Sequence, residues 1–312
     1  MSPEGQRVSV SVGDHELQLS NLDKPLFPTG FTKGDMLDYY ARIAPAMLPH
    51  LARRPVTVKR FPQGVGHKGF IEKNVPKHAP DWIPTITLPR KGDSHWEKLS
   101  ERSSDRDTTE FVVVDELATL MWLVNLASIE FHTPMWRVGQ KDKPRPPDLV
   151  VFDLDPGQPA TITQCCRIAV LLRDRAADDG IDLLPKTSGS KGMQLYGAVG
   201  AKRWAVNRTN DYAHTLAQEL EQSAPELAVS RMAKSLRAGK VFIDWSQNNP
   251  AKTTVSPYSL RSLDHPSVST PLTWDEVEEG AEHGGEKFLE LTPHDVLARV
   301  EAKGDLFTSL GS

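Results

Sequence analysis

The sequence contains little cysteine and no long apolar segment. Its two cysteines among 312 residues, Cys165 and Cys166, are adjacent, so they offer neither a disulfide framework nor the spacing of a metal site. No run of about 18 apolar residues is present, which predicts that no helix crosses a membrane. The N-terminus, MSPEGQRVSV, lacks the charged and apolar regions of a signal peptide. These absences predict a cytoplasmic protein whose two cysteines are small core residues.

An excess of positive charge is also absent, because the net charge is −4. The acid is concentrated near the C-terminus, where residues 271–302 hold nine Asp or Glu and two Lys or Arg. The rest of the chain has 35 basic and 32 acidic residues, a net charge of +3. Basic clusters at Arg53-Arg54, Lys59-Arg60 and Lys141–Arg145 are either solvated faces or loops that follow a DNA backbone.

Apolar patterning predicts alternating strands and helices. We expect a hairpin at 8–20, strands at 55–61, 108–115, 128–136, 148–157, 181–188, 192–199 and 240–246, and helices at 34–51, 116–127, 161–179 and 207–222. Short acidic helices should follow Trp274, and Trp122 and Trp136 should lie in the core. Several strands are joined by hairpin-length links, which favours an α+β fold with mixed sheets over a doubly wound one.

The stretch DLVVFDLDPG, residues 148–157, ends an apolar strand on two carboxylates. Asp153 and Asp155 are two residues apart, so both side chains leave the same face of the strand while Leu154 points into the core. A second apolar strand in KVFIDWSQN supplies Asp244. Three such carboxylates can share Mg²⁺ or Mn²⁺. The structural alternatives are solvated turn residues and an ion pair between Asp244 and Arg237.

The segment PKTSGSKGMQLY places Ser188-Gly189-Ser190-Lys191-Gly192 between two strands. Small residues can expose backbone N–H groups, and Lys191 adds charge, as in loops that hold phosphate. The spacing is not that of a Walker A loop. A plain hairpin turn is the alternative, but beside three carboxylates a triphosphate site is the better interpretation.

These motifs together resemble the polymerase domain of bacterial ATP-dependent DNA ligase D, in the archaeo-eukaryotic primase superfamily. The resemblance runs from about Leu19 to Trp274 and rests on LDKPLFP, TKGDMLDYY, RPVTVKRFPQG, FIEKN, IEFHTPMW, DLVVFDLDPG, TSGSKG, GKVFIDWSQN and TVSPYSLR. It implies a primase-type α+β core with mixed, largely antiparallel sheets flanked by helices. The expected organisation is one primase-polymerase domain over 1–312. Its N-terminal part, to about 140, would bind 5′-phosphate and template, its catalytic part would span about 128–270, and 271–312 would be an acidic tail.

The resemblance also implies an activity. Such domains are template-directed nucleotidyltransferases that use two divalent cations, Mn²⁺ or Mg²⁺, favour ribonucleoside triphosphates, and act on DNA gaps, overhangs and ends carrying a 5′-phosphate. End joining or gap filling in the bacterial nucleoid is the expected setting, with a DNA ligase and the Ku end-binding protein as expected partners and no membrane. A free-standing enzyme and a domain of a longer ligase both fit the sequence.

The resemblance assigns roles residue by residue. Metal ligands would be Asp153, Asp155 and Asp244; the nucleotide site would comprise Lys59, His132, Ser188, Lys191, Gln194, Arg237 and Arg261. Lys24 and Lys33 would hold the downstream 5′-phosphate, and Phe70 would stack on a template base. Two positions depart from the pattern: Gln194 stands where the superfamily usually has His, and Ile71 where a second aromatic is common.

Simpler interpretations exist for several of these residues. His132 and Phe70 could be core side chains, and Lys24 and Lys33 ordinary surface lysines. For the whole chain, two other functions remain. The run VVFDLDPG is similar to the start of haloacid-dehalogenase-type phosphohydrolases, although Pro156-Gly157 replaces their usual Gly-Thr and no downstream acidic pair is present. A catalytically inert DNA-binding repair module would keep affinity without chemistry, but the three carboxylates argue against it.

Overall fold

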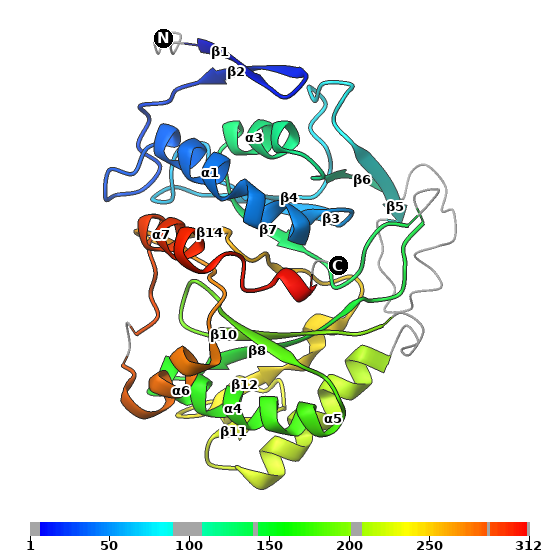
Figure 1. Cartoon of the computed structure of the whole chain (residues 1–312), viewed down its shortest axis with the longest axis vertical. Helices are drawn as coiled ribbons and strands as arrows, with labels where there is room; N and C mark the ends of the chain where they lie inside the picture. The colour runs from blue at the N-terminus through cyan, green and yellow to red at the C-terminus, as the bar shows by residue number, and fades with distance from the viewer. Residues whose placement is uncertain (1–6, 90–107, 140–142, 201–207, 286–287, 311–312) are drawn as a thin grey trace.

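Two antiparallel-rich sheets, one above the other, organise the molecule (Figure 1). The computed structural model describes residues 7–89, 108–139, 143–200, 208–285 and 288–310, so Lys141 of the basic loop lies outside the described residues. The predicted α+β class is confirmed. Within the described ranges, no helix is both long and apolar enough to cross a bilayer.

The N-terminal half is built on a six-stranded sheet of order β13-β7-β3-β6-β5, with β4 paired to β3. All its pairings are antiparallel. Its elements are β1 (Arg7–Val12), β2 (His15–Ser20), α1 (Lys33–Leu51), β3 (Pro55–Arg60), β4 (Phe70–Glu72), β5 (Thr85–Pro89), β6 (Thr108–Val113), α3 (Leu117–Asn125) and β7 (Ser128–Thr133).

The second half is built on a five-stranded sheet of order β11-β12-β8-β10-β9, in which β11 and β12 are parallel and the other neighbours antiparallel. Its elements are β8 (Leu149–Pro156), α4 (Ile162–Asp178), β9 (Leu183–Thr187), β10 (Met193–Ala198), α5 (Arg208–Ser223), β11 (Ala228–Val229), η3 (Lys234–Leu236), β12 (Val241–Asp244) and η4 (Trp245–Asn248).

The chain then returns to the first half. The remaining elements are β13 (Thr254–Val255), β14 (Leu260–Ser262), β15 (Pro266–Val268), α6 (Trp274–His283), α7 (Pro293–Lys303) and η5 (Thr308–Leu310). The predicted acidic helices are confirmed, and they are part of the folded body: α6 packs on α4, and α7 packs on α1 (Figure 1). Thr273 and Thr292 start these two helices with complete capping boxes.

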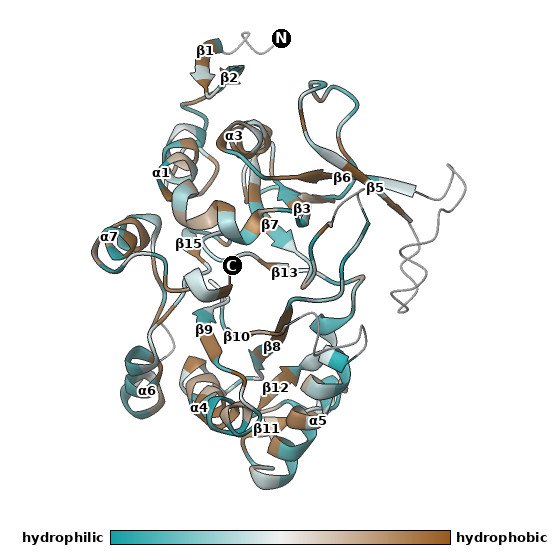
Figure 2. Cartoon of the chain, turned by 45° about the vertical axis from the view of Figure 1, so that its right-hand side comes forward, coloured by the Kyte–Doolittle hydropathy of each residue, from teal (hydrophilic) through white to brown (hydrophobic). Residues whose placement is uncertain are grey.

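Alternation along the central strands sends one set of apolar side chains to the helices, and the polar residues of these strands lie on the opposite face. On β8, Val150, Phe152 and Leu154 are fully buried in a core shared with α4 and α5, and the apolar first part of β8 is brown in Figure 2. Asp153 and Asp155 therefore leave the opposite face. On β3 and β7 of the other sheet, Val58 and Phe131 join the core under α1 and α3. The residues that alternate with them along β3 and β7 consequently point to the other face, toward the five-stranded sheet.

A buried ion pair joins the two halves and corrects one expectation. Arg54 is 1% exposed, so it is neither a solvated residue nor one that follows a DNA backbone. Its guanidinium donates two hydrogen bonds to Asp148, of 2.9 and 2.7 Å, and a third of 3.1 Å to the carbonyl of Pro134. Arg137 donates to the same carboxylate at 2.8 Å. The cluster immediately precedes β8 and thereby fixes the start of the strand that carries Asp153.

Cys165 and Cys166 are buried free thiols, and Trp122 and Trp136 are buried, as predicted.

Candidate active site

Polar side chains form a row across the five-stranded sheet. The register pairs Asp153 with Asp244 on one side and with Gln194 on the other, and Gln194 lies opposite Lys186. Side chains that are directly opposite in an antiparallel ladder share a face, so all four project to the same side. Asp155, two residues along β8, joins that face. The structure thus makes the three predicted carboxylates neighbours.

A hydrogen-bond chain orients the middle of this row. The Nζ of Lys186, which is fully buried, donates to Gln194 Oε1 at 2.6 Å and to Ser269 Oγ at 2.6 Å. Gln194 Nε2 then donates to Asp153 Oδ1 at 3.0 Å. Gln194 stands where the superfamily usually has His, and these bonds hold its amide nitrogen toward the carboxylate of Asp153.

The carboxylates repel one another, which suits a cation site. Burial and the charges of Asp155 and Asp244 raise the pKa of Asp153 to about 7, although Gln194 opposes the shift. Burial and Asp244 also raise the pKa of Asp155. A bound divalent cation would relieve both effects. Because all the donors are carboxylate oxygens, the set fits Mg²⁺ or Mn²⁺.

The three carboxylates do not yet converge on one point. In the part of the chain that the structure describes, no three His, Cys, Asp or Glu side chains already form a metal cluster. Asp244 Oδ1 accepts from the backbone N–H of Ser246 at 3.0 Å, and Oδ2 accepts from Gln247 Nε2 at 2.7 Å. These bonds to η4 fix the orientation of the Asp244 carboxylate, and Oδ2 keeps a second lone pair for an ion shared with Asp153.

Two neighbours of Asp244 differ from the expectations. Arg237, the partner offered by the structural alternative, instead lies over the ring of Phe242 with its guanidinium carbon 3.6 Å from the centroid. Gln247 lines the same pocket as Asp153 and was not anticipated. Its only sequence signal is a polar residue three positions after an acidic strand end.

The pocket has a volume of about 430 Å³ and lies between the sheets. Of the residues predicted for metal and nucleotide, it is lined by Asp153, Asp155, His132, Ser188, Lys191, Gln194, Arg237 and Arg261. Asp244 adjoins it through its register with Asp153, and Lys59 through its contact with Glu130, described below. His132 is thus a pocket residue, not a core histidine.

The loop from Ser188 to Gly192 closes one side of this pocket. A Cβ on Gly192 would lie 2.2 Å from the carbonyl oxygen of Leu154, so only glycine allows the loop to approach β8 this closely. The backbone N–H groups of Ser190 and Gly192 donate to Ser188 Oγ at 3.3 and 3.2 Å. These two amides are therefore already engaged, which leaves the exposed Lys191 as the clearest phosphate-binding group of the loop.

Lys24 and Lys33 lie side by side at the start of α1. The backbone N–H of Lys33 donates to the carbonyl of Lys24 at 2.9 Å, and Lys24 Nζ donates to Gln63 at 2.8 Å. Lys33 is buried and donates to the carbonyl of Ser20 at 2.6 Å, so the surface-lysine alternative is wrong for it. Burial, with the charge of Lys24, lowers the pKa of Lys33 to about 8.

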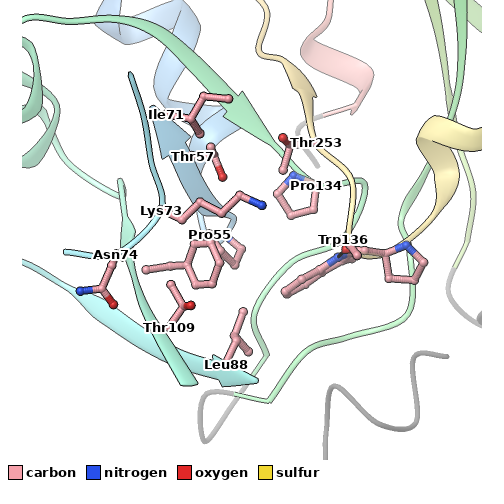
Figure 3. A pocket seen from close by; sticks show the side chains of 13 residues that line it. Pro55, Thr57, Ile71, Lys73, Asn74, Leu88, Thr109, Pro134, Trp136 and Thr253 are labelled. Carbon is pink, nitrogen blue, oxygen red and sulfur yellow. Dashed lines mark hydrogen bonds between the residues drawn. The ribbon is translucent and has the colours of Figure 1, made fainter. Parts of the chain in front are cut away.

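Phe70 and Ile71 are exposed on β4 and point to opposite faces of it. Phe70 is 44% exposed and lies 5.2 Å from the guanidinium of Arg60, so it is not a core residue. Ile71 lines a second hollow of about 540 Å³, together with Thr57, Lys73 and Trp136 (Figure 3). Thr253 borders both hollows, so this one adjoins the carboxylate pocket.

Comparison with known proteins assigns a family to this geometry. Residues 32–307 match the model of the LigD primase-polymerase domain. The chain is 42% identical over 295 residues to a multifunctional non-homologous end joining protein LigD of Mycolicibacterium smegmatis, covering 94% of this chain and 36% of that protein. It is 31% identical over 264 residues to the bifunctional LigD of Bacillus subtilis, covering 84% and 40%. The chain thus spans well under half the length of these relatives.

A solved structure gives the same answer. The polymerase domain from Mycobacterium tuberculosis ligase D in complex with DNA superposes with a TM-score of 0.82 at 40% identity, covering 95% of this chain and 98% of that one. The family model, the sequence identities and the fold agree. The chain belongs to the family of LigD primase-polymerase domains.

Proposed function

We propose that this chain extends DNA primers by template-directed nucleotidyl transfer and that the pocket between the sheets is its active site. The observation that carries the proposal is the juxtaposition of Asp153, Asp155 and Asp244 with the Ser188–Gly192 loop and with His132 and Arg261 across the pocket. Carboxylates that bind metal and cations that bind triphosphate are the two requirements of phosphoryl transfer.

Two divalent cations, Mg²⁺ or Mn²⁺, would be held by Asp153, Asp155 and Asp244 and would supply charge neutralisation and activation of a hydroxyl. The residues of the chain do the positioning. Lys191, Arg237, Arg261 and Lys59 hold the triphosphate, and Gln194 keeps Asp153 turned into the pocket. The 3′-hydroxyl of a primer attacks the α-phosphorus, the bond to the bridging oxygen breaks, and pyrophosphate leaves.

Both rival functions fit less well. A phosphohydrolase of the haloacid dehalogenase type needs a downstream acidic pair, whereas β12 contributes Asp244 alone. An inert binding module would have no reason to keep three mutually repelling carboxylates, since unpaired charge beside a buried core costs free energy.

Ribonucleotides should be the preferred substrates. Ser188 and His132 line the pocket where a sugar would lie beside the triphosphate, and a 2′-hydroxyl that pairs with a placed polar group discriminates against a sugar lacking it. We expect kcat/KM for a ribonucleoside triphosphate to exceed that of the matched deoxyribonucleotide by roughly tenfold or more on a gapped primer–template. Competition between the two in one reaction, resolved by product mass, measures this ratio. Equal use of both would contradict the assignment.

The DNA end is held by Lys24 and Lys33, with Phe70 stacking on a template base. The lysines lie at the N-terminus of α1, where the positive end of the helix dipole favours a phosphate, although the first backbone N–H groups of the helix are already engaged within the chain. Charge-assisted bonds of roughly 1.5–3 kcal/mol each imply at least tenfold tighter binding of a gap whose downstream strand carries a 5′-phosphate. That advantage should weaken as the pH rises above about 8, because Lys33 then loses its proton.

Binding of gapped DNA with and without the 5′-phosphate tests this pocket. A Lys24→Ala, Lys33→Ala double variant should bind both DNAs alike. Lys68→Ala, at an exposed lysine elsewhere on the same half, should change both affinities equally. A wild type that is indifferent to the phosphate would contradict the pocket.

The biological setting follows from the relatives' names, which place them in non-homologous end joining. The chain would act on gaps, overhangs and broken ends in the bacterial cytoplasm, at the nucleoid, together with a DNA ligase and the Ku end-binding protein. Residues 1–312 would work as one catalytic unit, because the nucleotide site takes residues from both sheets.

A further inference from the structure

A buried carboxylate contacts three of the side chains predicted for the nucleotide site, Lys59, His132 and Arg261. Glu130, on β7, is 3% exposed and was not singled out by its sequence context. Its Oε2 is 2.9 Å from His132 Nε2 and 3.4 Å from Arg261 Nε. Its Oε1 is 3.4 Å from Lys59 Nζ and accepts the backbone N–H of Ser262 at 3.0 Å. One carboxylate therefore contacts three cation-forming side chains from β7, β14 and β3.

Each of these three side chains was assigned to the nucleotide site, and they need a common anchor. The positive charges of Lys59 and Arg261 converge on one pocket, so they repel each other and would otherwise turn toward solvent. Burial opposes ionisation of Glu130, but the hydrogen bond from His132 and the charge of Arg261 outweigh it and keep the pKa of Glu130 below its usual range. The anchor is thus negatively charged at any pH at which a polymerase would work.

The anchor also reaches the phosphate-binding loop. Arg261, held by Glu130 through Nε, donates through Nη1 to the carbonyl of Ser188. A continuous path therefore runs from Glu130, in the six-stranded sheet, to the loop that closes the pocket from the five-stranded one. Replacing Glu130 would therefore disturb both the three side chains that it contacts and the Ser188–Gly192 loop.

We propose that Glu130 is a positioning residue that holds Lys59, His132 and Arg261 in the geometry that receives the incoming nucleoside triphosphate. The proposal rests on the proposed function, since it takes these three side chains to contact the nucleotide. Glu130 itself is buried and does not line the pocket, so it acts through its three neighbours and is not a catalytic residue.

The chemistry of the neighbours makes Glu130→Gln an informative change. Lys59, Ser262 and His132 hydrogen-bond to the carboxylate of Glu130 and Arg261 forms an ion pair with it, so both carboxylate oxygens are engaged. A glutamine has nearly the same shape, but its NH₂ group would face donors and find no acceptor there. Glu130→Asp keeps the negative charge, but its side chain is shorter by one methylene, so the carboxylate lies farther from the three neighbours. The matched control is Glu72→Gln, which removes a partly buried carboxylate on neighbouring β4 that pairs with Arg60 at 2.7 Å, outside the pocket.

The test separates nucleotide binding from turnover. For Glu130→Gln we expect KM for the nucleoside triphosphate to rise about 10- to 100-fold, with kcat falling less, and affinity for gapped DNA to change less than twofold. Glu130→Asp should recover part of the KM, and Glu72→Gln should resemble wild type. Equilibrium titration with a nonhydrolysable ribonucleoside triphosphate analogue and Mn²⁺ should show the same order of affinities, and melting curves show whether each variant is folded.

An unchanged KM and analogue affinity in folded Glu130→Gln would overturn the proposal. If Glu130→Gln does not fold, Glu130→Asp decides, and a wild-type KM in that variant would equally overturn it. Failure of the proposed function appears differently, as a wild type that binds the triphosphate analogue without extending any primer. In that case the analogue titration alone still tests Glu130.

Discussion

Replacing Asp244 with alanine is expected to lower the rate of primer extension by at least about 10³-fold while leaving the affinity for gapped DNA within about twofold. Losing a shared metal ligand removes several kcal/mol of transition-state stabilisation, and roughly 4 kcal/mol corresponds to 10³-fold in rate. Phosphate contacts elsewhere would maintain DNA binding. Single-turnover extension with saturating nucleotide and Mn²⁺ measures the effect. Near-normal extension by Asp244→Ala would refute the metal assignment.

Asp153→Asn supplies a control for folding, because chemistry and stability should change in opposite directions. The folded-state pKa of Asp153 is raised to about 7 from an unfolded value near 4. Between these values the folded state binds more protons than the unfolded state, so wild-type stability without metal falls as the pH rises. A neutral asparagine escapes this loss. The variant should therefore be inactive yet melt no lower than wild type at pH 8 in the presence of a chelator, whereas a lower melting temperature would indicate simple misfolding.

Replacing Arg54 with alanine is expected to have the largest effect on stability, about 3 kcal/mol. Breaking a buried pair by removing one partner costs roughly 3–5 kcal/mol, and the low end applies because Asp148 is partly exposed and keeps Arg137. The melting temperature should fall by roughly 5 °C. Extension below the melting transition should remain near normal, since Arg54 contacts no pocket residue among the bonds described above.

Arg53→Ala is the matched control for this change. Arg53 is adjacent but 44% exposed at its side chain, and its ion pair with Asp115 is 3.8 Å long. Its loss should cost less than about 1 kcal/mol. If Arg54→Ala melted like wild type and bound DNA more weakly, Arg54 would be the DNA contact that its basic neighbourhood first suggested.

The contrast between these two arginines illustrates what the sequence can and cannot predict. In the sequence, Arg53 and Arg54 look like equivalent surface cations. Arg54 is buried because it pairs with Asp148, which is 94 positions away and cannot be recognised as its partner from the sequence. Glu130 is similar: its partners Lys59 and Ser262 are 71 and 132 positions away. A carboxylate in an otherwise apolar strand is visible in the sequence, but the cations that it holds are not.

Local patterning did predict the elements that carry the chemistry. The strand expected at 148–157 is β8 at Leu149–Pro156, and its period of two placed Asp153 and Asp155 on one face correctly. Strands β4, β13, β14 and β15 have two or three residues each, too few for alternation to be recognised, so the positions of Arg261 and Phe70 on strands were not foreseen. The small residues of the Ser188–Gly192 loop predicted backbone N–H groups exposed to a phosphate, but Ser188 engages two of these amides.

The most direct test of the central claim is filling of a one-nucleotide gap in which each of the four bases serves in turn as template. The gap carries a downstream 5′-phosphate, and the four ribonucleoside triphosphates are supplied together with Mn²⁺. The account predicts addition of the complementary ribonucleotide in each case, release of pyrophosphate, no product with a chelator, and no product from Asp244→Ala. Addition that ignores the template base, or that persists in Asp244→Ala, would contradict it.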